Sequence, residues 1–191
     1  MASKGSISAS EPLDTAGIGA DVLEGCRVGD RLAQRLLYES FQCQVYRLTV
    51  RIVGWQDAED VTQQVFLQVF RKMGQFAGHS KFETWLYRLA MNEALQHLRK
   101  ERRWNHQPLR HEPMSPHKRE EEQTEDKDVL EQALSRLEPE LRSLFVLREV
   151  EGLSYREIAE AMGIPEGTVG SRLNRARREL QQHLADLGWE P

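Results

Sequence analysis

One stretch decides the fold of the C-terminal half of this chain: Ser154-Tyr-Arg-Glu-Ile-Ala-Glu-Ala-Met-Gly-Ile-Pro-Glu-Gly-Thr-Val-Gly-Ser171, continued by Arg172-Leu-Asn-Arg-Ala-Arg-Arg178. Ser154 and Glu157 have the spacing of a capping box, so a short helix is predicted to begin there and to end at Gly163. Apolar residues then recur at i, i+4, i+7 and i+11, which predicts a second helix with one buried stripe. These residues are Val169, Leu173, Ala176 and Leu180. The pair is predicted to be a helix-turn-helix whose second helix is basic.

The side of the second helix opposite this stripe is polar and basic, and it carries Ser171, Asn174, Arg175 and Arg178. In a helix-turn-helix the second helix enters the major groove, where hydroxyl and amide groups meet base edges and arginine reaches bases or phosphates. The sequence therefore predicts a reader of duplex DNA. The alternative is a pair of surface helices with a solvated basic face.

The composition is that of a soluble protein with modest cores, since 39% of the 191 residues are hydrophobic and 29% are charged. The formal net charge of -4 would disfavour nucleic acid if it were spread evenly, but acidic and basic residues are segregated along the chain. No stretch has the apolar pattern of a signal peptide or a membrane span, so we expect a cytoplasmic protein.

Metal, cofactor and enzyme chemistry are not expected. Cys26 and Cys43 each fall in a helical pattern and are interpreted as small core or boundary residues rather than as a disulfide. No Cys/His cluster has zinc-ligand spacing, and the sequence holds no Gly-rich phosphate loop or other enzyme motif. We therefore predict no metal, no cofactor, no catalytic residue and no enzymatic activity.

Four segments divide the chain. Residues 1–20 are rich in Ser, Gly and Ala without periodicity and are predicted to be a disordered tail, whereas residues 21–104 are helical throughout. Residues 105–125 hold three prolines and an acidic run, which predicts a flexible linker, and residues 126–187 form a second helical unit. Helix boundaries are expected at Gly54, Gly74 and Pro139. The predicted fold class is all-α, with two small helical domains joined by a flexible linker and a helix-turn-helix in the C-terminal one.

The segment from Phe82 to Arg103 reads as one helix that carries a second candidate nucleic-acid surface. On a helical wheel four residues fall within roughly one sixth of the circumference: Trp85, Arg88, Asn92 and Arg99. An aromatic ring, an amide and two guanidinium groups suit single-stranded DNA, because bases stack on rings and the backbone needs cations. The alternative is that Trp85 belongs to the core and that the basic end only suits a helix C-terminus. The helix alone leaves both interpretations open.

Three motifs follow one another along the chain: Asp57-Ala-Glu-Asp-Val-Thr-Gln-Gln-Val-Phe66, then Phe82-Glu-Thr-Trp-Leu-Tyr-Arg-Leu-Ala-Met-Asn92, then Leu147-Arg-Glu-Val-Glu-Gly-Leu-Ser-Tyr-Arg-Glu-Ile-Ala-Glu-Ala-Met162 with the helix after it. In this order they resemble the extracytoplasmic-function sigma factors of bacterial RNA polymerase, over nearly the whole chain. The resemblance implies that the first motif grips the clamp helices of the polymerase largest subunit. The second would melt the promoter and read its minus-ten element, and the third would read the minus-thirty-five element.

The resemblance also implies site residues. Asn92 would line a pocket for a flipped base, closed by the loop from Phe76 to Lys81. The full minus-ten set is Phe76, His79, Ser80, Lys81, Trp85, Arg88, Asn92, Arg99, Lys100, Arg102 and Arg103. The minus-thirty-five set is Thr168, Gly170, Ser171, Arg172, Asn174, Arg175 and Arg178. The residues that would face or support the polymerase contact are Asp57, Asp60, Gln63, Gln64 and Phe66.

Two positions depart from the family's pattern. Gln64 stands where an acidic residue is usual, which weakens charge complementarity to a basic clamp surface. Gly170 stands where a basic residue is common, which removes one DNA contact and costs about 1 kcal/mol of helix propensity relative to Ala.

The predicted function is that of an alternative sigma factor, which binds the polymerase core and directs promoter recognition, melting and initiation for a stress or envelope regulon. The implied partners are the clamp helices of the core polymerase, promoter DNA and an anti-sigma factor, soluble or membrane-anchored, and the free protein is expected to be monomeric. Two rivals remain. A helix-turn-helix regulator would bind a symmetric operator without polymerase, and an interaction scaffold would leave both basic faces unused.

Overall fold

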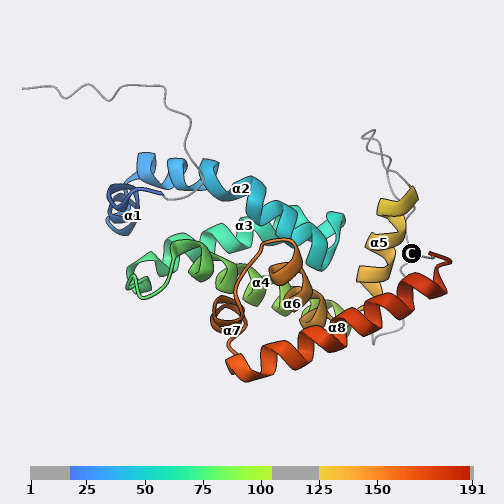
Figure 1. The fold of residues 1–191 in the computed structure, drawn as a ribbon. Coiled ribbons are helices and arrows are strands. Elements are labelled where there is room, and N and C mark those ends of the chain that lie inside the picture. The colour runs from blue at the N-terminus through green and yellow to red at the C-terminus, as the bar shows by residue number, and fades with distance from the viewer. Residues whose placement is uncertain (1–17, 105–124, 190–191) are drawn as a thin grey trace, which may run out of the picture.

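The computed structural model describes residues 18–104 and 125–189, and every regular element in these ranges is a helix, as Figure 1 shows. The predicted all-α class is confirmed. The elements of the N-terminal domain are α1 (Ala20–Arg27), α2 (Arg31–Val53), α3 (Trp55–Lys72), the 3-10 helix η1 (Met73–Gln75) and α4 (Phe82–Trp104). Those of the C-terminal domain are α5 (Glu125–Arg136), α6 (Pro139–Glu149), α7 (Tyr155–Met162) and α8 (Glu166–Asp186).

The predicted tail and linker fall largely outside the described residues. Ile18 packs against the core and α1 begins at Ala20, so the last residues assigned to the tail belong to the folded domain. At the other boundary, α5 begins at Glu125, which the prediction had placed in the linker.

The N-terminal domain is built on the long helices α2, α3 and α4. Gly54 ends α2 and precedes α3 with a φ of 90°, a backbone conformation that glycine adopts without strain. Between α2 and α3 the buried hydroxyl groups of Thr49 and Thr62 lie 2.9 Å apart and share a hydrogen bond. Gly74 lies in η1, directly after α3, so both breaks predicted at glycines are confirmed.

The C-terminal domain follows its local sequence signals closely. Pro139 stands in the first turn of α6, where its missing N–H costs no helical hydrogen bond. The capping box of Ser154 and Glu157 is complete at the start of α7, and Gly163 ends α7 in the left-handed conformation, with a φ of 64°. Along α8 the predicted stripe is buried, which confirms the helix-turn-helix: Val169, Leu173, Ala176 and Leu180.

The two domains pack against each other. Helix α7 lies along α4, and α6 contacts both α2 and α4 (Figure 1). One cluster of buried side chains runs from the N-terminal domain into α6, α7 and α8, whereas a smaller cluster joins α5 to the end of α8. The spacing of apolar residues gave no indication of this contact.

The two cysteines are free thiols in different settings. Cys26 is buried in the core, as a small apolar residue would be, and Cys43 is exposed on α2. None of the helices in the described part of the chain combines the length and the apolar character that a bilayer crossing requires.

Candidate nucleic-acid and polymerase interfaces

Helix α4 exposes one narrow polar stripe. Arg88, Asn92 and Arg99 are exposed and lie on one side of the helix, and we call them the α4 stripe. Gln96 is also exposed, one turn after Asn92, and most of the remaining circumference is buried or half-buried, because the N-terminal core covers one side and the C-terminal domain covers the next. The stripe continues into exposed cations in the last turns of α4, namely Lys100, Arg102 and Arg103.

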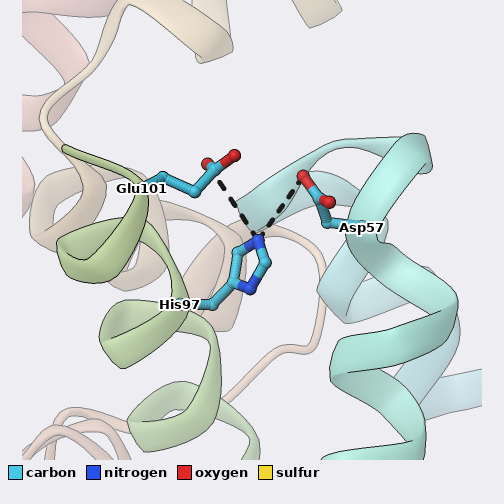
Figure 2. Close-up of side chains that lie close together, drawn as sticks. All are labelled: Asp57, His97 and Glu101. Carbon is cyan, nitrogen blue, oxygen red and sulfur yellow. Dashed lines mark ion pairs between the residues drawn. The ribbon is translucent and has the colours of Figure 1, made fainter. Parts of the chain in front are cut away.

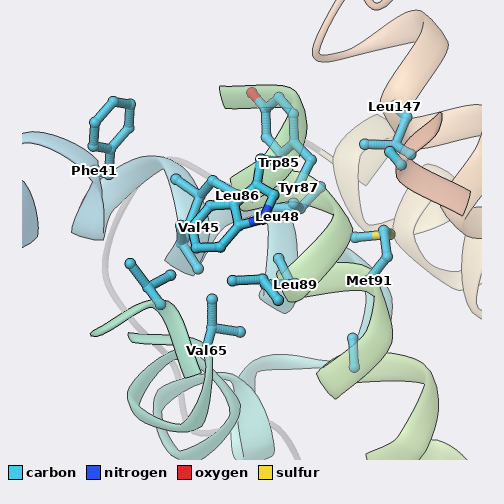
Figure 3. Close-up of a cluster of buried hydrophobic side chains, with 14 of the residues drawn as sticks. Phe41, Val45, Leu48, Val65, Trp85, Leu86, Tyr87, Leu89, Met91 and Leu147 are labelled. Atoms are coloured by element: carbon cyan, nitrogen blue, oxygen red, sulfur yellow. The ribbon is translucent and has the colours of Figure 1, made fainter. Parts of the chain in front are cut away.

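Trp85 does not belong to the exposed stripe. Its side chain is only 7% exposed, and its ring lies 5.4 Å from that of Phe76 and 5.7 Å from that of Phe82, centre to centre. Figure 3 shows Trp85 within the cluster of buried side chains, beside Leu86. The expectation that Trp85 forms a stacking surface next to Asn92 is therefore corrected, and the alternative of a core tryptophan is right.

The loop before α4 packs on the same aromatic cluster through Phe76. Phe76 is 7% exposed, and its carbonyl oxygen accepts a hydrogen bond of 2.6 Å from the guanidinium of Arg27. His79 and Lys81 are exposed on the outer side of the loop, and Ser80 is half-buried. Phe76 therefore anchors the loop, and the polar residues that follow it are the ones that can reach a ligand.

Helix α8 presents its polar side to solvent. Ser171, Asn174, Arg175 and Arg178 are exposed, whereas Thr168, Gly170 and Arg172 are half-buried at its edge. The Nε of Arg175 lies 2.7 Å from a carboxylate oxygen of Glu179, and this hydrogen bond raises the pKa of the guanidinium. Within the described residues Arg172 and Arg178 have no acidic partner, so they are the arginines of this face that are free to meet phosphates.

The polymerase set on α3 divides into exposed and buried members. Asp60, Gln63 and Gln64 are exposed, and Phe66 is 3% exposed with its ring 4.7 Å from that of Tyr38. Phe66 thus supports α3 from inside. Leu67 was missed by the sequence analysis: it is 61% exposed and follows Asp60, Gln63 and Gln64 at helical spacing on the same face. An apolar residue outside the buried stripe was the signal that could have identified it.

Asp57 turns toward α4 instead of facing outward. Figure 2 shows its carboxylate beside His97, whose Nε2 lies 3.4 Å from Asp57 Oδ2 and 4.0 Å from Glu101 Oε2. In the described part of the chain these three residues are the one group whose nitrogen and oxygen atoms lie close enough to share a cation. The cluster joins the first turn of α3 to the second half of α4. That the protein needs no metal stays a prediction.

Family models and curated relatives match this architecture. Residues 37–104 match the model of sigma-70 region 2, and residues 127–180 match that of sigma-70 region 4. The chain is 35% identical to the ECF RNA polymerase sigma-E factor of Haemophilus influenzae over 180 residues, covering 87% of this chain and 95% of that protein. The chain belongs to the extracytoplasmic-function sigma factors. It is also 36% identical to the RNA polymerase sigma-H factor of Pseudomonas aeruginosa, covering 87% and 93% of the two chains.

Two solved structures share the fold. The sigma factor RpoE in complex with the anti-sigma factor NepR from Bartonella quintana superposes with a TM-score of 0.67 at 24% identity, over 79% of this chain and 96% of that chain. CnrH in complex with the cytosolic domain of CnrY gives a TM-score of 0.63 at 20% identity, over 87% and 96%.

Membership of this family identifies the role of the chain in transcription. It is an alternative sigma factor, which binds core RNA polymerase and directs it to promoters. The match to region 2 begins inside α2 and covers α3 and α4, and the helix-turn-helix of α7 and α8 begins within the match to region 4. The exposed faces of α3, α4 and α8 are therefore its candidate surfaces for binding polymerase and DNA.

Proposed function

We propose that this sigma factor traps the melted minus-ten strand on the α4 stripe and reads the minus-thirty-five duplex with α8. The observation that carries the proposal is the α4 stripe itself, an amide between two guanidinium groups exposed on a helix that is otherwise largely buried. Because α4 is packed against both domains, the backbone that carries these arginines is held in place and gives a well-defined cationic surface. Such a surface suits an extended, negatively charged strand.

The chemistry at the minus-ten element follows from base extrusion. Unstacking one base costs a few kcal/mol, which the protein must return through hydrogen bonds and packing. The amide of Asn92 offers both a donor and an acceptor to a base edge, and the loop residues His79, Ser80 and Lys81 lie in the connection just before α4. Because Trp85 is buried, the stacking partner for the base is not this ring. The support for the pocket comes instead from the aromatic cluster beneath the loop.

The chemistry at the minus-thirty-five element is that of a recognition helix in the major groove. Ser171 and Asn174 would meet base edges, and Arg172, Arg175 and Arg178 would reach phosphates or guanines. Gly170 leaves a position of this helix without a side chain. We expect a lower affinity for duplex than a basic residue at this position would give.

Docking to the core polymerase is assigned to the exposed face of α3. Asp60, Gln63, Gln64 and Leu67 combine one charge, two amides and one large apolar side chain, and that mixture is typical of a protein interface. We further propose that an anti-sigma factor restrains the protein, as NepR does in its complex with the Bartonella quintana sigma factor. The protein itself catalyses no reaction and works in the cytoplasm, beside the polymerase and the chromosome.

Run-off transcription with purified core polymerase tests the proposal. Fragments from a promoter library are transcribed with and without the protein, and transcripts that depend on it are expected and would identify the promoter. No transcripts, together with tight binding of duplex by the protein alone, would favour a regulator that works without polymerase.

Variants of the two surfaces separate their roles. Asn92→Ala should reduce open-complex formation about tenfold or more with little change in duplex binding. Gln132→Ala, which removes an exposed amide from α5, a helix to which no DNA contact is assigned, serves as its control. Arg178→Ala, which removes an exposed arginine of α8, should weaken duplex binding about equally for all sequences and lower its salt dependence. Equal effects of Asn92→Ala and Arg178→Ala on duplex affinity would contradict the division of labour.

A further inference from the structure

One nitrogen and two carboxylate groups from different helices meet where α3 begins. Asp57 lies in the first turn of α3, and His97 and Glu101 lie one turn apart in the second half of α4. Figure 2 shows the Nε2 atom of His97 directed toward both carboxylates. It lies 3.4 Å from Asp57 Oδ2 and 4.0 Å from Glu101 Oε2, and the three ligand atoms all lie within 4.8 Å of one another.

The Nε2 atom of His97 is buried, and within the described part of the chain it has no hydrogen-bond partner. Asp57 Oδ2, at 3.4 Å, lies beyond the usual length of an N–H···O hydrogen bond. A buried polar atom without a partner is uncommon, because it loses its contact with water and gains nothing in return. A metal ion between the three ligand atoms would satisfy this nitrogen, since neutral imidazole coordinates metals through its ring lone pair.

The charges of the cluster match those of a divalent cation. Asp57 and Glu101 bring two negative charges, and among residues 18–104 and 125–189 neither carboxylate pairs with a lysine or an arginine. Asp57 and His97 are half-buried and Glu101 is exposed. An ion can therefore enter from solvent and keep water at its remaining coordination positions.

The kinds of donor atom favour zinc over magnesium or calcium. Zinc is commonly bound by imidazole nitrogen together with carboxylate oxygen, whereas magnesium and calcium prefer oxygen at every position. At bond lengths of about 2.0 to 2.1 Å, the ligands of a tetrahedral zinc ion lie about 3.3 Å apart. The distance between His97 and Asp57 is already close to this value. The exposed side chain of Glu101 needs to approach by roughly 1 Å.

We propose that Asp57, His97 and Glu101 bind a divalent transition-metal ion, for which zinc is the best fit, with water as the remaining ligand. The ion joins the start of α3 to the second half of α4 and stabilises their packing. None of the three residues belongs to the α4 stripe or to the exposed face of α3, so the site does not depend on the proposed function. The prediction of no metal was based on Cys/His spacing along the chain, which cannot detect ligands on two separate helices.

Zinc titration of the full chain, stripped of metal with a chelator and dialysed, tests the site. Isothermal titration calorimetry in a non-coordinating buffer should detect a site that weakens about tenfold or more in His97→Gln. Loss of an outer-shell partner alone typically costs 10- to 100-fold in metal affinity, so loss of a ligand should cost at least as much. Asp57→Asn and Glu101→Gln, which keep the side-chain shape, should also weaken zinc binding. Magnesium should bind the parent chain more weakly than zinc.

His183→Gln is the matched control, because the chain holds other histidines that can bind zinc. His183 lies on α8 and forms no ion pair within the described residues, so its loss should leave the affinity of the site unchanged. NMR of the side-chain nitrogens identifies the ligand in the parent chain itself. Zinc should shift the Nε2 resonance of the one imidazole whose signal disappears in His97→Gln. Circular dichroism checks that all variants keep their helix content.

Thermal unfolding tests whether the ion joins the two helices. Zinc at about 100 times its Kd should raise the Tm of the parent chain by about 5 °C and that of His97→Gln by much less. Two outcomes would overturn the site: zinc that binds His97→Gln as tightly as the parent chain, or zinc that shifts only other imidazoles. Either result would leave the cluster as ion pairs alone. An unchanged Tm in the zinc-bound parent chain would rule out that the ion stabilises the packing of α3 on α4.

Discussion

Helices α4 and α8 have similar lengths and similar assigned roles, but they are buried in different ways. Helix α8 buries one stripe at regular spacing, mainly against its own domain, and leaves the opposite side to solvent. Helix α4 is covered on two sides by two different domains, so only the narrow α4 stripe stays exposed along its middle. A helix with one buried side can be changed on the other side without consequence for the fold. A helix that packs between two domains has little surface that can be changed in this way, and the exposure of its DNA-facing residues depends on how the domains are arranged.

The largest effect is expected from substituting Arg142, which hydrogen-bonds to helix ends in both domains. The guanidinium of Arg142 donates a hydrogen bond of 2.9 Å to the carbonyl oxygen of Ile52 at the end of α2. It also donates to the carbonyl oxygens of Ser135, in the last turn of α5, and of Leu137, which follows that helix. Burial lowers the pKa of Arg142, and the charge of Arg102 lowers it further. Keeping the guanidinium charged here therefore costs free energy, which its hydrogen bonds offset. Arg142→Met should lower the free energy of unfolding by about 3 kcal/mol, because it leaves carbonyl groups of both domains without a donor.

Denaturant titration measures this loss, and the control is Arg136→Met. Arg136 is an exposed arginine in the last turn of α5, so its loss should change stability by less than about 0.5 kcal/mol. Equal destabilisation by the two variants would show that Arg142 does not hold the domains together and would break the comparison.

A smaller effect is expected from the hydroxyl that joins α4 to the C-terminal domain. Tyr87→Phe keeps the ring but leaves Glu151 and Gln44 without their shared partner. We expect a loss of about 1 to 2 kcal/mol, together with a wider distribution of distances between the domains. Tyr38→Phe is the control, because it removes the same hydroxyl group from a tyrosine whose ring packs on Phe66, between α2 and α3 of the N-terminal domain. A Tyr87→Phe protein as stable as Tyr38→Phe would contradict the idea that α4 depends on its second covering.

On α8 the comparison predicts that one substitution raises the stability of the protein. A Cβ at Gly170 would lie 3.5 Å from the Tyr155 ring, an ordinary contact, so Gly170→Ala should raise stability by about 1 kcal/mol through helix propensity alone. Thermal unfolding followed by circular dichroism measures it. Gly163→Ala provides the contrast, since the φ of 64° at the end of α7 makes any side chain there unfavourable. A loss of stability in Gly170→Ala would show that α8 is more tightly packed on α7 than its single stripe implies.

The smallest expected effect is a pH dependence at the contact between α7 and the loop before α4. The hydrogen bonds that Glu157 accepts from Lys81 and Ser154 lower its pKa from its usual value near 4.5 to about 2. A carboxylate with a lowered pKa stabilises the native state fully above pH 4.5, and the stabilisation is lost as the pH falls toward 2. Thermal midpoints of the parent chain should therefore fall more between pH 5 and pH 3 than those of Glu157→Gln. Parallel curves for the two proteins would exclude this contribution, which solvent exposure of Lys81 keeps small.

Local signals in the sequence predicted the C-terminal domain well and α4 only in part. The Ser154 cap, the Gly163 ending and the α8 stripe depend on neighbours within a few residues, so their spacing is visible in the chain. The burial of Trp85 depends on Phe76 from the preceding loop, and that of Tyr87 depends on a domain more than fifty residues away. A wheel drawn for one helix cannot tell which of two domains covers an apolar residue. The exposed Leu67 was not singled out, although its position outside the buried stripe of α3 can be recognised from the spacing of the apolar residues.

The two oxygens of one carboxylate set a limit on how this chain can change. One oxygen of Glu157 accepts hydrogen bonds from the backbone and hydroxyl of Ser154, which starts α7, and the other accepts from Lys81 in the N-terminal domain. Most substitutions that loosened the grip between the domains would also fray the helix on which the DNA-reading helix rests. Glutamine, which preserves the cap and gives up the ion pair, is the narrow exception.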